Sequence, residues 1–367
     1  MSTLGGYGGY GGYGGYGGYG GYGGYGGYGG YGGYGGYASP GAGEAPGVVT
    51  AALQSTRAAL VGPFAGATLN PPLPPVGDVP ARLTRWDALP RLQACALEFL
   101  SGLAFRPDAR RHALDIVFVD LARKPLAELP IAWLQRPTEA QFRAQLDLVA
   151  NYADLRGARE AEILAQALPS QQPFWAGIVG LQPHRHRHTL ELLTLALMLA
   201  VDVHQRCKHV FACPRPVEWS PQIQPLISTP GHSSWPSGHA TEIHTVITVL
   251  DALLPHADAV REPLQRVAAR IAVNRTVAGL HFPVDSAAGR VLGTALGAFF
   301  VARCTGQPRW RQHRFAGAEF HAGDGSALDF DAWSPITTVR TSQRLQASPL
   351  LGQLWQVARA EWQAASA

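Results

Sequence analysis

Residues 189–208 read TLELLTLALMLAVDVHQRCK, and this stretch decides the fold. Between Leu190 and Val203 only Glu191, Thr194 and Asp202 interrupt the apolar side chains. A helix that is apolar over most of its circumference is buried among other elements rather than lying on a surface. We therefore predict a helix over Thr189–Lys208 at the centre of a helical bundle.

Further helices are predicted on both sides of this stretch, because apolar residues recur at three- and four-residue spacing. No stretch alternates apolar and polar residues as a half-buried strand does, and residues 306–340 are expected to be irregular. The sequence thus predicts an all-α fold, a single helical-bundle domain. The predicted helices are Trp86–Leu103, Ala109–Arg123, Thr138 to about Leu168, His239–Leu254, Arg261–Ala278, Val284–Cys304 and Ser342–Ala365.

Three of these helix boundaries carry local signals. Pro125 is expected to end the helix before it, since proline disfavours helical backbone at the preceding residue. Thr138 and Gln141 have the spacing of a capping box. Pro283 is typical of a helix N-terminus.

The N-terminal region has a different composition. Residues 5–37 are consecutive Gly-Gly-Tyr triplets, which offer no aliphatic side chain to bury and make ordering costly. We expect residues 1–45 to be a disordered tail and residues 46–80 to be a linker rich in proline and glycine. Residues 81–367 remain for the folded domain.

Composition excludes several classes of protein. The net charge of +4 and the lack of a basic run argue against a nucleic-acid partner. The longest uncharged apolar run, Val291–Ala302, is shorter than the roughly 20 residues that span a bilayer. With no signal peptide visible, we expect a soluble protein, cytoplasmic or exported by a non-classical route, and a homo-oligomer stays open. The cysteines lack zinc-site spacing, and free thiols are favoured over a Cys207–Cys213 bridge.

Three segments concentrate chemically active side chains. They read KHVFACPRP at 208–216, HSSWPSGH at 232–239 and NRTVAGLHFPVD at 274–285. Together they supply the cations Lys208, Arg215 and Arg275, and the neutral donors Ser237 and Gly238 at a predicted helix start. Of the 30 basic residues only Lys124 and Lys208 are lysines, so Lys208 in particular calls for a role.

Cations beside a helix N-terminus make an anion site. An arginine fork donates two bonds to a tetrahedral oxyanion, whereas a lysine acts as a point charge on one oxygen. Gly238 would let the backbone approach such a ligand closely.

The same segments supply two imidazoles and a carboxylate. His281 and Asp285 are four residues apart, so Asp285 can fix the tautomer of His281 and raise its basicity. The set suits a five-coordinate, phosphorus-like centre. His281 would attack or ligate it from one side, and His239 would act as the acid/base on the other.

The motifs Lys-x6-Arg-Pro, Pro-Ser-Gly-His and Arg-x5-His-x3-Asp occur in this order within residues 189–296. They resemble the type 2 phosphatidic acid phosphatase and vanadium-dependent haloperoxidase superfamily, although Asn274 stands where the family often has Ser or Thr. The resemblance implies an α-helical bundle with the site in its core. It implies that His281 is the phosphate nucleophile or the vanadate ligand and that His239 is the acid/base. It implies oxyanion contacts from Lys208, Arg215, Ser237, Gly238 and Arg275.

The resemblance leaves two branches. His232 lies seven residues before His239, where the algal bromoperoxidases look to carry a second histidine, and Trp235 replaces the usual tyrosine of the haloperoxidase loop. The favoured function is a vanadate-dependent haloperoxidase that oxidises bromide or iodide with hydrogen peroxide to hypohalous acid. Vanadate is the implied cofactor, Lys208 would polarise the bound peroxide, and His232 would assist His239 in moving protons.

Two alternatives stay open. One is a soluble acid phosphatase that hydrolyses phosphomonoesters through a phosphohistidine at His281 and needs no cofactor. The other is a non-catalytic oxyanion-binding or surface protein whose Gly-Gly-Tyr tail is the functional part. The expected partners are therefore small molecules: hydrogen peroxide and a halide, or a phosphomonoester.

Overall fold

The structure is a computed structural model of the whole chain. It describes residues 46–60, 72–121, 124–167, 171–255, 257–306, 310–320, 337–341 and 345–363. The predicted disordered tail, residues 1–45, lies outside the described residues. Helix α3 (Pro46–Leu60) falls within the predicted linker.

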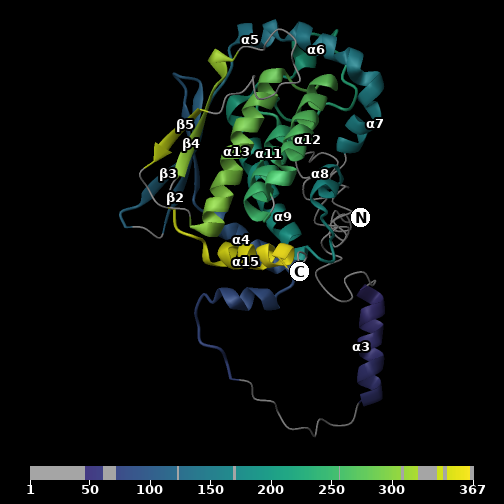
Figure 1. The fold of residues 1–367 in the computed structure, drawn as a ribbon, viewed down its shortest axis with the longest axis vertical. Coiled ribbons are helices and arrows are strands. Elements are labelled where there is room, and N and C mark those ends of the chain that lie inside the picture. Colours follow the sequence, from purple (N-terminus) through teal and green to yellow (C-terminus); the bar gives the residue numbers. More distant parts are fainter. Residues whose placement is uncertain are drawn as a thin grey trace.

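Helices make up most of the described chain (Figure 1). The α-helices after α3 are α4 (Ala88–Leu100), α5 (Glu139–Ala144), α6 (Leu146–Tyr152), α7 (Arg156–Gln166), α8 (Gln172–Val179), α9 (Arg187–Phe211), α10 (Pro216–Trp219), α11 (Gly238–Leu253), α12 (Ala257–Val277), α13 (Pro283–Thr305) and α15 (Pro349–Gln363). Short 3-10 turns are η3 (Pro80–Arg85), η4 (Ala153–Leu155) and η5 (Gly317–Glu319).

Helices α9, α11, α12 and α13 form the centre of the molecule (Figure 1). Most side chains of α9 and α13 are buried, as the apolar composition of these two stretches predicts. The helices expected over Thr189–Lys208, His239–Leu254 and Val284–Cys304 are confirmed, with α9 extending to Phe211.

Helix α13 approaches α11 closely along a row of glycines. Gly289, Gly293 and Gly297 are spaced by four residues and therefore share one face. A Cβ added at Gly293 would lie 2.3 Å from the backbone oxygen of Thr241. The glycines thus allow α13 to touch the backbone of α11, whose first turn carries His239.

We expect Gly293→Ala to destabilise the protein by about 1–3 kcal/mol, the usual cost of overpacking a close helix contact. Gly177→Ala is the matched control, because Gly177 lies in α8 and a Cβ there meets nothing within 4 Å. Alanine favours a helix over glycine, so the control should be neutral or stabilising by up to about 1 kcal/mol. Urea unfolding of the two variants measures the difference, and an unchanged midpoint for Gly293→Ala would contradict the close contact.

The prediction of an all-α fold is wrong. A five-stranded mixed sheet lies beside the helices, in the order β1 (Leu103–Asp108), β2 (Ala113–Asp120), β3 (Ala127–Gln135), β4 (Trp310–Ala316) and β5 (Thr337–Thr341). Neighbouring strands are antiparallel except β3 and β4, which are parallel. The connection between β3 and β4 therefore contains helices α5 to α13, whereas α3 and α4 precede the sheet and α15 follows it.

The helix predicted over Ala109–Arg123 is wrong: this stretch contains strand β2, which is buried on both faces. Its side chains are almost all buried, so the alternation that identifies a half-buried strand is absent. Its centre, Ile116 to Val119, is β-branched and aromatic, which is typical of strands. The register with β3 shifts between Ile116 and Val117, next to Pro130, which has no N–H to donate.

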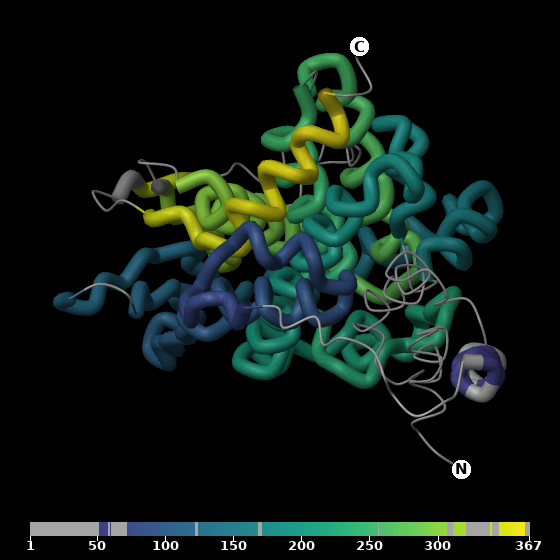
Figure 2. Tube along the Cα trace, turned by 90° about the horizontal axis from the view of Figure 1, so that it is seen from below, coloured from purple at the N-terminus to yellow at the C-terminus, as the bar shows by residue number. Residues whose placement is uncertain are grey.

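The sheet packs against α13 through aromatic side chains. The rings of Phe118 on β2 and Phe299 on α13 lie 5.3 Å apart, and the guanidinium of Arg303 covers Phe118 at 4.8 Å. At one end of the molecule α4 and α15 lie side by side across the helices (Figure 2). The sheet and these two helices thus enclose the bundle rather than contributing to its centre.

The remaining boundaries are partly as predicted. The capping box of Thr138 and Gln141 is present at the start of α5, but the long helix expected to about Leu168 is divided into α5, α6 and α7. The stretch 306–340, expected to be irregular, contains β4 and β5. The last helix is α15, which is shorter than the predicted Ser342–Ala365.

Within the described ranges, α13 is the one helix with the length and apolar composition to cross a membrane, and 83% of its most apolar window is buried in the fold. A core helix meets the same criterion, and this degree of burial is that of a core helix. All four cysteines are free and buried, as expected.

Candidate active site

The first motif lies at the end of α9, where a loop is fastened to it. Lys208 in the last turn donates from Nζ to the carbonyl oxygens of Ser233 at 2.9 Å and Ser234 at 2.6 Å. Ser233 Oγ donates to the Lys208 carbonyl at 2.5 Å. Burial, and then the charge of Arg215, hold the pKa of Lys208 well below its usual value. A nearby anion would favour the charged form.

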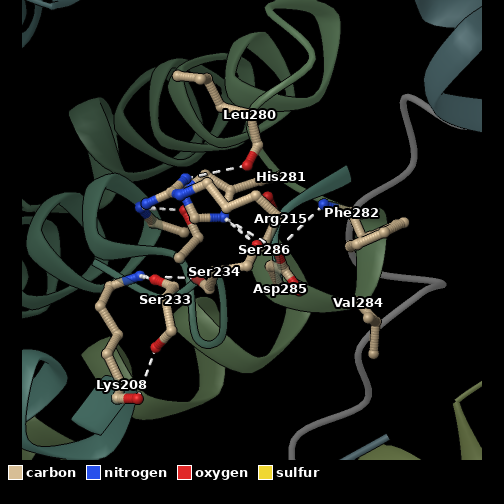
Figure 3. Close-up of polar contacts among 12 residues, drawn as sticks. Lys208, Arg215, Ser233, Ser234, Leu280, His281, Phe282, Val284, Asp285 and Ser286 are labelled. Atoms are coloured by element: carbon tan, nitrogen blue, oxygen red, sulfur yellow. Dashed lines mark hydrogen bonds and ion pairs between the residues drawn. The ribbon is translucent and has the colours of Figure 1, made fainter. Parts of the chain in front are cut away.

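Arg215 links this loop to the third motif (Figure 3). Its Nε donates to the His232 carbonyl at 3.1 Å and its Nη2 to His232 Nδ1 at 3.1 Å. Its Nη1 donates to the Leu280 carbonyl at 3.0 Å and lies 3.3 Å from His281 Nε2. One buried guanidinium therefore contacts both His232 and His281.

The contacts of His281 define its tautomer. Nδ1 lies 2.9 Å from Asp285 Oδ2, which also accepts from the Phe282 N–H at 3.0 Å and from Ser234 Oγ. A carboxylate only accepts, so Nδ1 carries the proton. Nε2 is then left with a lone pair that faces the Nη1 donor of Arg215.

Electrostatics keep this lone pair available. Burial, and then the charges of Arg215 and Lys208, hold the pKa of His281 well below its usual value, so the imidazole is neutral at pH 7. Burial raises the pKa of Asp285 to about 6, while its hydrogen bonds and the nearby cations oppose this rise. Asp285 is therefore mainly ionised at pH 7 and can stabilise positive charge that develops on His281.

His239 and Arg275 meet at a residue that the sequence did not single out. His239 Nε2 donates to the backbone carbonyl of Gln166 at 3.0 Å, and Arg275 Nη2 donates to Gln166 Oε1 at 2.8 Å. Burial, and then Arg275, lower the pKa of His239 to about 4. Arg275 is buried, and its Nε and Nη1 have no hydrogen-bond partner among the described residues.

Ser237 and Gly238 form the start of α11. Ser237 is the N-cap, and its Oγ accepts from the Ala240 N–H at 3.4 Å. A Cβ at Gly238 would lie 3.1 Å from the His204 ring. The structure therefore accounts for Gly238 by its packing against His204, a reason that the sequence did not indicate.

The predicted residues come from three motifs, which lie on α9, α11, α12 and α13 and in the loops between them. Lys208, Arg215, His232, His281 and Asp285 belong to one hydrogen-bond network, and the Ser237 N–H joins it through the Asp285 carbonyl at 2.9 Å. The second group, His239 and Arg275 on Gln166, lies close enough for His239 to lower the pKa of His281. The two groups therefore lie near one another.

Several neighbours that were not predicted as site residues support the site. Ser234 holds both Lys208 and Asp285, and its only signal is its place in the second motif. His204 lies one turn before Lys208 on α9, and Glu242 lies just after His239 on α11. His204 Nε2 is 3.1 Å from Glu242 Oε1. Gln166 has no sequence signal. Asn274 donates to Glu162 at 2.9 Å and to Gln166 at 3.0 Å, so it supports the second group from behind.

We expect the protein to lose stability in mild acid. Burial lowers the pKa of His232 and His244 to about 3 and of His239 and His313 to about 4. When the chain unfolds, these imidazoles regain an ordinary pKa near 6.5 and bind protons. The free energy of unfolding is therefore unaffected by these histidines above pH ~6.5. It falls as the pH drops toward 4, by up to ~1.4 kcal/mol per pH unit for each histidine. Urea unfolding at pH 7.5, 6 and 5 measures this slope; a pH-independent midpoint would contradict it.

The arrangement is suited to an oxyanion. Buried cations are costly unless anions compensate their charge, and Arg275 keeps two buried donors that have no partner among the described residues. His281 Nε2 offers one lone pair to the central atom of such an anion. No group of three or more His, Cys, Asp or Glu side chains that could hold a bare metal ion lies in the described ranges.

Comparison with known proteins agrees with this chemistry. The sequence model of one protein family, the PAP2 superfamily, matches residues 190–308. The match contains all three motifs and excludes α7, which carries Gln166. No curated protein matches the chain.

Proposed function

We propose, from the membership of residues 190–308 in the PAP2 superfamily, that this chain is an enzyme that binds a tetrahedral oxyanion at His281. Superfamily membership fits phosphatase or haloperoxidase chemistry. The observation that carries the proposal is the tautomer of His281. Its Nδ1–H donates to Asp285, so its Nε2 lone pair lies beside Arg215. That lone pair can attack phosphorus or ligate vanadium.

Of the two reactions, we propose that of a vanadate-dependent haloperoxidase that oxidises bromide or iodide with hydrogen peroxide to hypohalous acid. The supporting observation is the position of His232, whose Nδ1 lies 3.1 Å from the same guanidinium that contacts His281. His232 is partly buried and contacts Arg215, one of the proposed oxyanion contacts. Burial lowers its pKa to about 3, so it is neutral at pH 7, and a bound oxyanion would raise that pKa and let it accept a proton.

The residues present fit vanadate. His281 Nε2 would be the ligand, and Arg275 has two unpartnered buried donors for its oxygens. Lys208, Arg215, Ser237 and the Gly238 N–H would complete the oxyanion contacts. When bound, vanadate would supply a Lewis acid that activates hydrogen peroxide toward the halide.

In this reaction the protein's own residues would place positive charge beside the oxyanion and transfer protons. Lys208 and Arg215 place positive charge beside the oxyanion in a buried setting, where it acts strongly. His239, neutral because of burial and Arg275, would take up the proton that peroxide releases. A bound anion would raise the pKa of His239 toward its usual value, which would let it return the proton.

The alternative is an acid phosphatase that acts on phosphomonoesters and needs no cofactor. His281 Nε2 would form a bond to phosphorus while the ester P–O bond breaks, and His239 would protonate the departing alcohol. Water would then cleave the phosphohistidine. This reaction also needs a neutral His281 with a free lone pair on Nε2, so the state of His281 supports both reactions equally. A non-catalytic oxyanion-binding protein is the third outcome of the test.

A paired assay decides among these readings. The purified protein is given orthovanadate, hydrogen peroxide and bromide with a phenolic dye, and separately an aryl phosphate without vanadate. We expect vanadate-dependent bromination that inorganic phosphate suppresses. Phosphate-ester hydrolysis without bromination would establish the phosphatase, and binding of phosphate without either reaction would establish the non-catalytic protein.

A further inference from the structure

The C-terminal end of α7 enters the site from outside the matched superfamily region. Gln166, the last residue of α7, is fully buried and contacts the site with two atoms, while a third atom bonds within α7. Its Oε1 accepts from Arg275 Nη2 at 2.8 Å, its backbone carbonyl accepts from His239 Nε2 at 3.0 Å, and its Nε2 donates to Glu162 Oε1 at 3.0 Å. A single residue thus joins the acid/base candidate to an oxyanion-binding arginine.

The contact with His239 determines which ring nitrogen can exchange protons. A carbonyl oxygen only accepts hydrogen bonds, so His239 Nε2 carries a proton and Nδ1 holds the lone pair of the neutral ring. The last carbonyls of a helix have no partner within it and lie at the negative end of its dipole. The end of α7 is therefore a suitable acceptor for a ring N–H.

The contact with Arg275 orients the guanidinium without neutralising it. The side chain of Gln166 is uncharged, and Asn274 also donates to its Oε1 at 3.0 Å. The nearest carboxylate on α7, Glu162, is held by Arg270 at 2.7 Å and by Asn274 at 2.9 Å. Arg275 keeps its charge and two unpartnered donors for a ligand.

We propose that Gln166 is a positioning residue of the site: its side chain aims Arg275 at the oxyanion, its neutrality leaves the charge of Arg275 to that oxyanion, and its carbonyl makes Nδ1 the working nitrogen of His239. This rests on the proposed function only in assuming that an oxyanion binds. Neither contact depends on which of the two reactions follows.

The charge part is tested with Gln166→Glu, which keeps the shape and places a carboxylate against Arg275. Gln93→Glu is the control, because Gln93 is exposed on α4 and the change in net charge is the same. Titration calorimetry with inorganic phosphate, and separately with orthovanadate, should show affinity at least ~10-fold weaker for Gln166→Glu, which is ~1.4 kcal/mol, and unchanged for Gln93→Glu. Equal affinity for Gln166→Glu and the wild type would overturn the charge part.

The tautomer part is tested on the wild-type protein, so it does not depend on a variant folding. Nitrogen-15 NMR of histidine-labelled protein at pH 7, with the signal assigned by its loss in His239→Asn, should show His239 protonated at Nε2 and not at Nδ1. The opposite tautomer would overturn this part. If the wild type bound neither anion, the proposed function would fail, whereas the NMR result would still decide the role of the Gln166 carbonyl.

Discussion

Replacing His281 by alanine is expected to lower kcat/KM at least ~1,000-fold in whichever of the two reactions the protein catalyses, a loss of ~4 kcal/mol of transition-state stabilisation. The variant loses the Nε2 lone pair, which has to bond to the central atom in both reactions. Among the described residues, the other ring nitrogen that contacts Arg215 is His232 Nδ1, which is 3.1 Å from the guanidinium and is occupied by that contact. The remaining cations can still bind an anion, but they cannot form the covalent bond.

His209→Ala is the matched control. His209 follows Lys208 on α9, but its side chain is exposed, so this variant removes an imidazole near the site without touching it. We expect His209→Ala to keep wild-type activity and both variants to keep the wild-type melting temperature. Retention of more than a tenth of the wild-type kcat/KM by His281→Ala would contradict a covalent role for His281.

The second large effect is expected at Asp285, and it depends on which property of the carboxylate is removed. Asp285→Ala removes the acceptor that keeps the proton on His281 Nδ1, so the ring is free to carry its proton on Nε2 instead. We expect kcat to fall ~100- to 1,000-fold. The loss should appear in kcat rather than KM, because the residues that bind the oxyanion are unchanged.

Asp285→Asn separates hydrogen bonding from charge. The contacts of Asp285 converge on Oδ2, and Oδ1 has no partner among the described residues, so an amide can keep its oxygen in place and turn its nitrogen to Oδ1. The tautomer should survive while the negative charge is lost, and kcat should fall only ~10-fold. Steady-state kinetics of the two variants test this order. Equal losses would mean that the charge of Asp285, rather than its acceptor, supports His281.

Local signals predicted the parts of the fold that depend on one helix at a time. The helix over the apolar stretch of α9 and the start of α5 at the Thr138 capping box were predicted correctly. The sheet could not be predicted in this way, because β3 pairs with β4 across almost the whole helical region. Strand β2 is buried on both faces and lacks the two-residue alternation by which a strand is recognised.

The site was predictable where chemistry follows spacing. His281 and Asp285, four residues apart at a helix start, make the contact that their spacing indicates. The contribution of Gln166 was not predictable, because half of it comes from a backbone carbonyl, and any residue at the end of α7 has one. The reason for Gly238 also depends on tertiary packing, since His204 comes from a different helix.

The most direct test is a crystal structure of the protein soaked in orthovanadate, with the vanadium located by its anomalous scattering. The account predicts one vanadium per chain bonded to His281 Nε2, with its oxygens contacting Lys208, Arg215 and the free donors of Arg275. Vanadium bound elsewhere, or oxygens that leave Arg275 without a contact, would contradict it.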